Sequence, residues 1–219
     1  MVAVAKLVPM GDEPAPLLFT LEEFYALPEG PPDYEFEEGK LIDMPRPHPR
    51  HQAILRELVA EITIYLRSKP IGTVWPEVDV QISRSRVYAP DLVFLAADNR
   101  ERLRQLEGRI IGAPDLVVEI VSPSSASRDR VAKFNAYRQA AVPWYWLVDG
   151  ESLVVEEFQL TPAGYLAIAR VAAGGTFQPQ LFPDLQINLA NLLGEPVEFA
   201  DAGRDRRPRV RRRTGPGER

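Results

Sequence analysis

Hydrophobic residues recur with helical spacing in two parts of the chain. The clearer part runs from about residue 49 to residue 66 and predicts an amphipathic helix. Its apolar positions are Ile54, Leu55, Leu58, Val59, Ile62, Tyr65 and Leu66. A second helix is predicted over residues 129–141, and it ends before Pro143 because the residue before a proline disfavours helical geometry. Near the N-terminus, Thr20 and Glu23 have the spacing of a capping box, which predicts a short helix there.

Short runs rich in β-branched and aromatic residues predict the strands between and after these helices. They are the hairpin "YEFEEGKLIDM", then "TVWPEVDVQI", "DLVFLA", "LVVEIV", "WYWLVD", "LVVEEFQL" and "YLAIARVA". A short closing helix, "NLANLL", follows the last strand. This order of elements predicts an α/β protein, in which helices flank a mixed sheet and further antiparallel strands are appended.

A length of 219 residues is typical of one domain with short extensions. We expect an N-terminal extension over residues 1–19, a domain over residues 20–195 and a basic tail over residues 196–219. Charge supports the last boundary, because residues 201–219 carry a net +5 and the rest of the chain carries −10. The tail is expected to be disordered, since runs of like charge repel, and it could contact nucleic-acid phosphates.

Composition narrows the function classes. The absence of cysteine excludes disulfides, thiolate metal sites and a cysteine nucleophile. No apolar run approaches the roughly 20 residues that a membrane span needs, and the N-terminus lacks the sustained apolar core of a signal peptide. We therefore expect a cytoplasmic protein without a membrane partner.

One carboxylate stands out, because Glu119 interrupts the apolar run at residues 116–121. An unpaired charge inside a buried strand is costly, so a partner is needed. Side chains alternate along a strand, and pairing of this strand with the one that Asp91 opens could bring the two carboxylates together. Such a pair could clamp a hard cation such as Mg²⁺. The alternative, that Asp91 caps a turn and Glu119 pairs with an arginine, is equally compatible with the spacing.

Several segments together resemble a known nuclease group. They are "YEFEEGKLIDM", "HQAIL" from His51, "APDLVF", "APDLVVEIVSPS", and the Lys133 and Tyr137 pair that leads to "VPWYWLVD". Their order and spacing are similar to those of the PD-(D/E)xK nuclease superfamily, and within it to the Uma-two family of putative restriction endonucleases. The resemblance covers roughly residues 20 to 190.

The resemblance implies a restriction-endonuclease-like fold and a metal-dependent endonuclease that hydrolyses phosphodiester bonds, with DNA as the expected substrate. Asp91, Glu119 and the carbonyl of Ile120 would bind Mg²⁺ or Mn²⁺, which would activate water. Glu35 matches the family's glutamate and could complete the acidic group, and His51 could contact a phosphate, orient water or serve as a capping or surface residue. A homodimer is expected.

The chain departs from the superfamily at Val121, where the usual lysine is missing. Lys133, one of four lysines, could replace it, because the following helix should run back over the sheet and bring Lys133 level with Glu119. The alternative is a lysine that extends past the helix to water. If no lysine reaches the carboxylates, we expect a catalytically inactive nuclease-fold module that binds nucleic acid or protein.

Overall fold

The computed structural model describes residues 18–28, 30–104, 106–122 and 128–193. The expected basic tail at residues 196–219 and most of the expected N-terminal extension lie outside these ranges. No helix in the described part of the chain is long and apolar enough to cross a membrane.

The predicted helices are present, and one of them has an unexpected form. Helix α1 spans Leu21–Tyr25 and begins with the predicted capping box, and α2 spans Pro49–Ser68. The next helical segment begins as a π-helix, η2, over Arg128–Lys133 and continues as the α-helix α3 over Phe134–Gln139. Two short 3₁₀-helices, η1 and η3, span Ala97–Arg102 and Leu189–Asn191. The π-helical turn is a departure from the regular helix that the spacing predicted, and such wide turns are frequent at functional sites.

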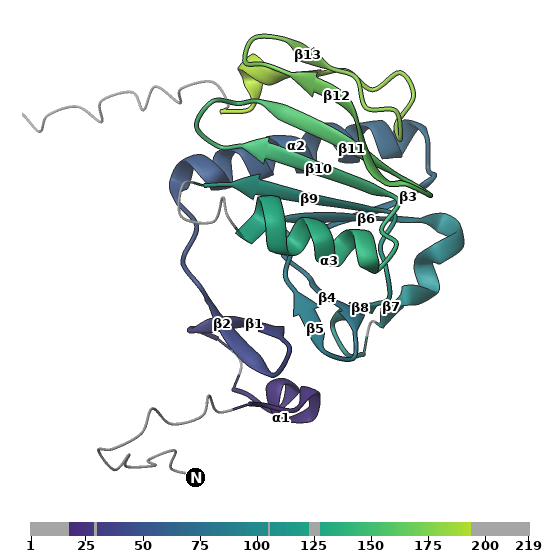
Figure 1. Cartoon of the computed structure of the whole chain (residues 1–219). Coiled ribbons are helices and arrows are strands. Elements are labelled where there is room, and N and C mark those ends of the chain that lie inside the picture. The colour runs from purple at the N-terminus through teal and green to yellow at the C-terminus, as the bar shows by residue number, and fades with distance from the viewer. Residues whose placement is uncertain (1–17, 29, 105, 123–127, 194–219) are drawn as a thin grey trace, which may run out of the picture.

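A six-stranded mixed sheet forms the centre of the molecule, in the order β12-β11-β10-β9-β6-β3 (Figure 1). Its strands are β3 (Gly72–Pro76), β6 (Leu92–Ala96), β9 (Leu116–Val121), β10 (Trp144–Asp149), β11 (Val155–Thr161) and β12 (Gly164–Val171). Only the β9–β10 pair in this sheet is parallel, and its crossover contains η2 and α3.

A second six-stranded sheet has the order β2-β1-β5-β4-β8-β7. Its strands are β1 (Asp33–Glu37), β2 (Lys40–Met44), β4 (Asp79–Ser83), β5 (Arg86–Tyr88), β7 (Leu103–Arg104) and β8 (Arg109–Ile111). Strands β13 (Thr176–Phe177) and β14 (Ile187–Asn188) form a separate pair.

The run "TVWPEVDVQI", predicted as one strand, is divided between the two large sheets as β3 and β4. The break lies at Glu77, whose φ of 48° is left-handed and turns the chain out of the extended direction. Pro76 precedes it and has no N–H to continue a ladder. The Glu77 N–H instead donates to the carbonyl oxygen of Asp91 over 3.1 Å. This turn therefore also holds the start of β6, where Asp91 lies.

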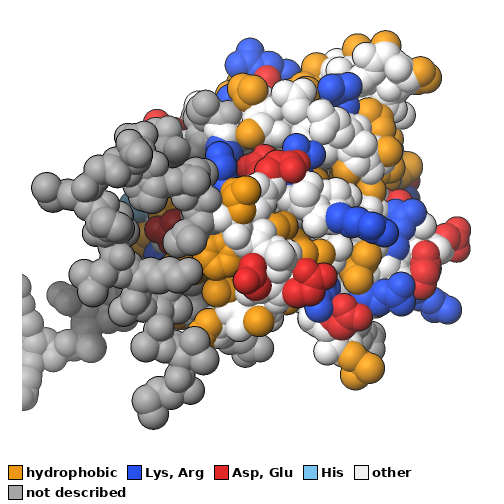
Figure 2. Space-filling model, turned by 60° about the horizontal axis from the view of Figure 1, so that its bottom comes forward, with side chains coloured by type: hydrophobic (Ala, Val, Ile, Leu, Met, Phe, Trp, Pro, Cys, Tyr) orange, Lys and Arg blue, Asp and Glu red, His pale blue; other side chains and the backbone are white. Residues whose placement is uncertain are grey.

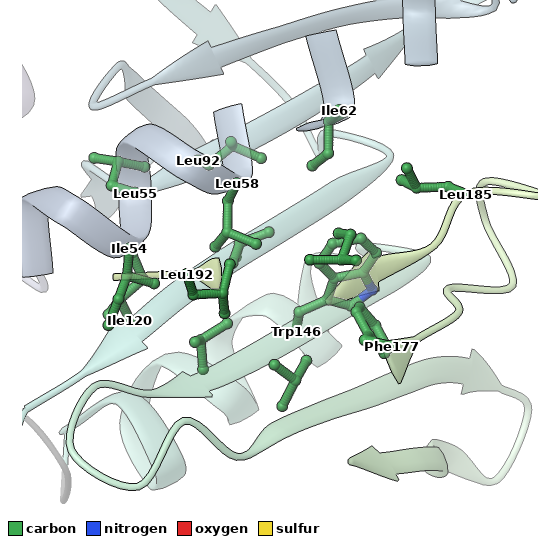
Figure 3. Packing of buried hydrophobic residues seen from close by; sticks show 14 of the residues in the cluster. Ile54, Leu55, Leu58, Ile62, Leu92, Ile120, Trp146, Phe177, Leu185 and Leu192 are labelled. Atoms are coloured by element: carbon green, nitrogen blue, oxygen red, sulfur yellow. The ribbon is translucent and has the colours of Figure 1, made fainter. Parts of the chain in front are cut away.

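The central sheet is covered on both faces, by α2 on one and by α3 on the other (Figure 1). On the α2 side, Leu58, Ile120 and Trp146 pack with Leu192 in one buried cluster (Figure 3). On the α3 side, Val117, Val121 and other residues pack with Tyr137 in a second cluster. Strand β9 is therefore buried on both faces, as its apolar run predicted, and Glu119 lies on the α3 side because it shares parity with Val117 and Val121.

A second buried glutamate, Glu157 on β11, lies away from this region and has neutral partners. The Trp146 Nε1–H donates to its Oε1 over 3.1 Å, and the Gln180 N–H donates to the same oxygen over 3.2 Å. Burial raises the pKa of Glu157 above its ordinary value of 4.5, although these donors oppose the shift.

Because the raised pKa of Glu157 makes the folded state hold its proton more tightly, stability should fall as the pH rises through that pKa. A Glu157→Gln variant keeps an acceptor oxygen and does not titrate. We expect the melting temperature of the native protein to fall relative to this variant as the pH is raised above about 4.5. Melting curves that run parallel for the two proteins over this range would contradict the prediction.

Candidate active site

Asp91 and Glu119 lie opposite each other on neighbouring strands. Strands β6 and β9 are antiparallel, with Leu92 opposite Val118 and Val93 opposite Val117, so extending the register by one residue brings Asp91 opposite Glu119. Opposed residues project from the same face of a sheet with neighbouring Cβ atoms. The backbone agrees, since the Ile120 N–H donates to Asp91 Oδ2 over 2.5 Å. The Asp91 carboxylate is therefore held beside the backbone of β9, at the residue that follows Glu119.

Lys133 reaches Glu119 from the helix on the same face. Its Nζ lies 3.0 Å from Glu119 Oε1, 3.0 Å from Glu35 Oε1 and 3.7 Å from Asp129 Oδ1, and only 6% of its side chain is exposed. Burial alone would lower the pKa of Lys133, but the charges of Glu119, Glu35 and Asp129 outweigh it and raise the pKa well above 10.5. Lys133 is thus a buried, charged lysine and does not extend to water.

The wide turn of η2 contributes to this placement of Lys133. Asp129 and Lys133 are four residues apart and both are buried, so they form an ion pair on the inner side of the helix. The Tyr145 hydroxyl donates to the Asp129 carbonyl oxygen over 3.1 Å, which ties the start of the helix to β10. The chain thereby presents a charged helix face to the sheet, where an apolar face is the rule.

Glu119 is held through one of its two oxygens. The Lys133 ammonium and the Tyr137 hydroxyl both donate to Oε1, over 3.0 and 2.7 Å. Among the described residues, no hydrogen bond reaches Oε2. Burial raises the pKa of Glu119 well above its ordinary value, the charge of Lys133 opposes this, and the nearby Asp91 and Asp129 raise the pKa further. A cation near Oε2 would stabilise the charged form of Glu119 and so oppose this rise in its pKa.

Glu35 joins the site from β1 in the other large sheet. Its Oε1 accepts hydrogen bonds from the Ala89 N–H, over 3.1 Å, and from Lys133, and its Oε2 pairs with Nη1 of Arg128. The side chain is fully buried. Glu35 is therefore a direct partner of Lys133, and the hairpin residue Glu37 beside it pairs with Tyr88, whose hydroxyl donates to it over 2.8 Å.

His51, in the first turn of α2, lies against Asp91. Its Nε2 is 2.9 Å from Asp91 Oδ1. Burial lowers the pKa of His51, but the hydrogen bond and the charge of Asp91 outweigh it, so the pKa is raised above 6.5. The cap of α2 is His48, whose Nδ1 accepts from the Arg50 N–H over 3.2 Å. His51 is thus neither a capping nor a surface histidine, because it holds one oxygen of Asp91.

All five side chains proposed from the sequence therefore lie in one connected group. Sequence reasoning did not identify Arg128 and Asp129 as members. The spacing of Asp129 four residues before Lys133 was a usable signal for an ion pair, but Arg128 contacts a residue from a distant strand and had none.

The charges of this group favour a divalent cation. We call the group the acidic cluster; it contains the carboxylates of Asp91, Glu119, Glu35 and Asp129 and the cations of Lys133 and Arg128. The carboxylates outnumber the permanent cations, and oxygen donors suit Mg²⁺ or Mn²⁺. Within the described ranges, no group of three or more His, Asp or Glu side chains could hold a metal. A metal between Asp91 and Glu119 would therefore need a backbone carbonyl and water to complete its ligands.

One face of the molecule is not uniformly basic. Figure 2 shows acidic and basic side chains interspersed over the described part of one face of the molecule. A polyanion would therefore find no broad attractive field on this face, and its binding would depend on individual cations and on bound metal.

Comparisons with known proteins support the family and the fold. A family model named Uma2 and described as "Putative restriction endonuclease" matches residues 21–190. The crystal structure of "a putative nuclease belonging to DUF820" from Anabaena variabilis superposes with a TM-score of 0.64 at 23% identity, covering 80% of this chain and 97% of that one. No curated protein matches the chain. The structural similarity supports the restriction-endonuclease-like α/β fold.

Proposed function

The chain belongs to the Uma2 family, described as putative restriction endonucleases, and from this premise we propose that it is a metal-dependent endonuclease that hydrolyses phosphodiester bonds in DNA. Asp91 and Glu119, with the Ile120 carbonyl, would hold Mg²⁺ or Mn²⁺. Lys133 would supply the positive charge that the superfamily's usual lysine provides, while Glu35 and His51 would be auxiliary.

The observation that carries this proposal is the position of the Lys133 ammonium, 3.0 Å from Glu119 Oε1. Val121 occupies the usual lysine position and is packed in the apolar cluster on the α3 side, so it brings no charge to the carboxylates. Lys133 brings an ammonium to the same carboxylate from the following helix. In this proposal, a different element of the fold supplies the cation that the chemistry requires beside Glu119.

When bound, the metal would lower the pKa of an attacking water and polarise the phosphodiester. The protein's own residues perform the positioning. His51 and the Ile120 N–H orient the two oxygens of Asp91, and Lys133 and Tyr137 orient Glu119 through Oε1. The Lys133 charge, in a buried site, also offsets negative charge that develops on the phosphate during attack.

The competing function is a nuclease-fold module that binds nucleic acid or protein without cleavage. One observation favours it: Lys133 is buried among three carboxylates and bonds two of them over 3.0 Å, which is the arrangement of a structural ion pair. The two functions differ in their dependence on metal, which a direct assay separates.

We expect the purified protein to nick or cut plasmid DNA in Mg²⁺ or Mn²⁺ and to lose this activity in EDTA. The same metals should raise the melting temperature, because a ligand that binds only the folded state stabilises it. Gel electrophoresis measures cleavage, and thermal denaturation measures the shift in melting temperature. Parallel cleavage assays with single-stranded DNA and with RNA determine which polymer is the substrate. A protein that shows neither cleavage nor a metal-dependent shift would be the non-catalytic module.

Sedimentation of the same sample tests the expected homodimer.

A further inference from the structure

Two cations of the acidic cluster share one carboxylate but differ in access to solvent. Lys133 pairs with Oε1 of Glu35 and Arg128 pairs with Oε2. The Lys133 side chain is 6% exposed, whereas the Arg128 side chain is 26% exposed. A residue must reach the surface of the site to touch a polymer, so Arg128 is the better placed of the two.

Two of the three donors of Lys133 are engaged in hydrogen bonds, with Glu119 and Glu35, and its charge also faces Asp129. An ammonium has three N–H groups, and Glu119, Glu35 and Asp129 lie 3.0, 3.0 and 3.7 Å from its nitrogen. Turning Lys133 toward a phosphate would leave one of these buried carboxylates without its partner, which is costly. Lys133 can therefore stabilise charge at the site without forming a direct bond to the substrate backbone.

Arg128, in contrast, has donors to spare. A guanidinium has five N–H groups, and within the described ranges only Nη1 makes a close contact, with Glu35. Its Nη2 is buried and has no hydrogen-bond partner among the described residues, because Glu37 Oε2, 3.8 Å away, is too far for a hydrogen bond. The ring of Tyr88 lies beneath the guanidinium carbon, 5.6 Å from its centroid, and limits its movement.

From these contacts we propose that Arg128 binds a phosphate of the substrate backbone that enters the acidic cluster, because its buried Nη2 lacks a partner there while its side chain is partly exposed. This inference rests on the proposed nuclease function. The guanidinium fork suits two oxygens of a phosphodiester, and Glu35 holds it beside the site. Arg86, the other arginine next to Glu37, is less suitable because it bonds Glu38 over 2.9 Å and Gln139 over 3.3 Å.

Binding of a short fluorescein-labelled DNA duplex, the matching single strand and an RNA strand, with Ca²⁺ in place of Mg²⁺, tests this proposal. Anisotropy titrations over a range of salt concentrations give the affinity and its salt slope. We expect Arg128→Ala to weaken binding about tenfold and to reduce the slope by about one phosphate contact. Arg128→Lys should keep most of the salt slope, because it keeps the positive charge. It should lose part of the affinity, because lysine lacks the two-pronged donor geometry of the guanidinium.

Arg130→Ala is the matched control. Arg130 lies on the same π-helix but pairs with Glu156 and Asp149 on the neighbouring strands, so its loss should leave the affinity and the slope unchanged. Melting temperatures of all three variants separate binding from stability. If Arg128 only supports the fold, the affinity of the variants for DNA should decrease in parallel with their melting temperatures, and the salt slope should stay the same. That result would overturn the proposal.

The two proposals fail in different ways. If the native protein cleaves DNA and Arg128→Ala has the same KM and the same salt slope, the role of Arg128 is rejected. The proposed nuclease function is then retained. Native binding without any cleavage, together with a reduced slope in Arg128→Ala, would reject the nuclease and keep the phosphate contact. A native protein that binds none of the three polymers would reject both.

Discussion

Replacing Glu119 with Gln should reduce DNA cleavage by about a thousandfold or more, because a metal supplies several kcal/mol of transition-state stabilisation and each 1.4 kcal/mol is about tenfold in rate. Glutamine retains an acceptor for Lys133 and Tyr137, so the fold should persist. It removes the negative charge that would attract the cation. Asp91→Asn should have a similar effect on cleavage, and both variants should lose most of the rise in melting temperature that Mg²⁺ or Mn²⁺ produces.

Glu157→Gln provides the matched control for this experiment. It makes the same chemical change at another buried glutamate, whose partners are Trp146 and Gln180 and not the acidic cluster. It should retain cleavage and the metal-induced thermal shift. Undiminished cleavage by Glu119→Gln, or thermal shifts of equal size in Glu119→Gln and the native protein, would reject the assignment of Glu119 as a metal ligand.

Replacing Lys133 with Met should destabilise the fold by about 3–5 kcal/mol, because removing one partner of a buried ion pair leaves uncompensated charge. Glu119, Glu35 and Asp129 would then face one another without the central ammonium. Urea denaturation measures the loss. The raised pKa of Lys133 means that its stabilisation is fully present below about pH 10.5 and is lost only as the pH rises through the higher folded value.

A double variant separates charge from packing. If the loss in Lys133→Met comes from repulsion, adding Glu35→Gln should recover part of it, because one buried negative charge is removed. Lys69→Met is the control: Lys69 pairs with Asp184 at the surface, where 43% of its side chain is exposed, and its loss should change stability little. If the stability changes of the two single variants simply add in the double variant, repulsion between the carboxylates is not the cause of the loss in Lys133→Met.

The activity of Lys133→Met addresses the catalytic role of the lysine separately. At a temperature where the variant is fully folded, cleavage should be lost while the metal-induced shift in melting temperature persists, because an ammonium is a donor and cannot be a metal ligand. Full cleavage by folded Lys133→Met would leave Lys133 with a structural role only.

Local patterns in the sequence determined most of the secondary structure and the facing positions of Asp91 and Glu119. The capping box at Thr20, the helical spacing in α2 and the strand runs each depend on neighbours within a few residues, so they can be read from one chain. Strand parity likewise predicted that Asp91 and Glu119 could face each other, and the paired register of β6 and β9 brings them opposite.

Only the tertiary structure decided which charges surround that pair. Glu35 bonds the Ala89 N–H across 54 residues of sequence, and Arg128 meets Glu35 from a different element of the chain. The division of "TVWPEVDVQI" between two sheets is of the same kind, since strand partners are chosen by non-local pairing. The sequence suggested that Lys133 reaches Glu119 and, through the family resemblance, that Glu35 joins the acidic group, but not that Arg128 pairs with Glu35. Those contacts depend on how two sheets and a π-helix pack together, and packing between distant segments leaves no periodic signal in the sequence.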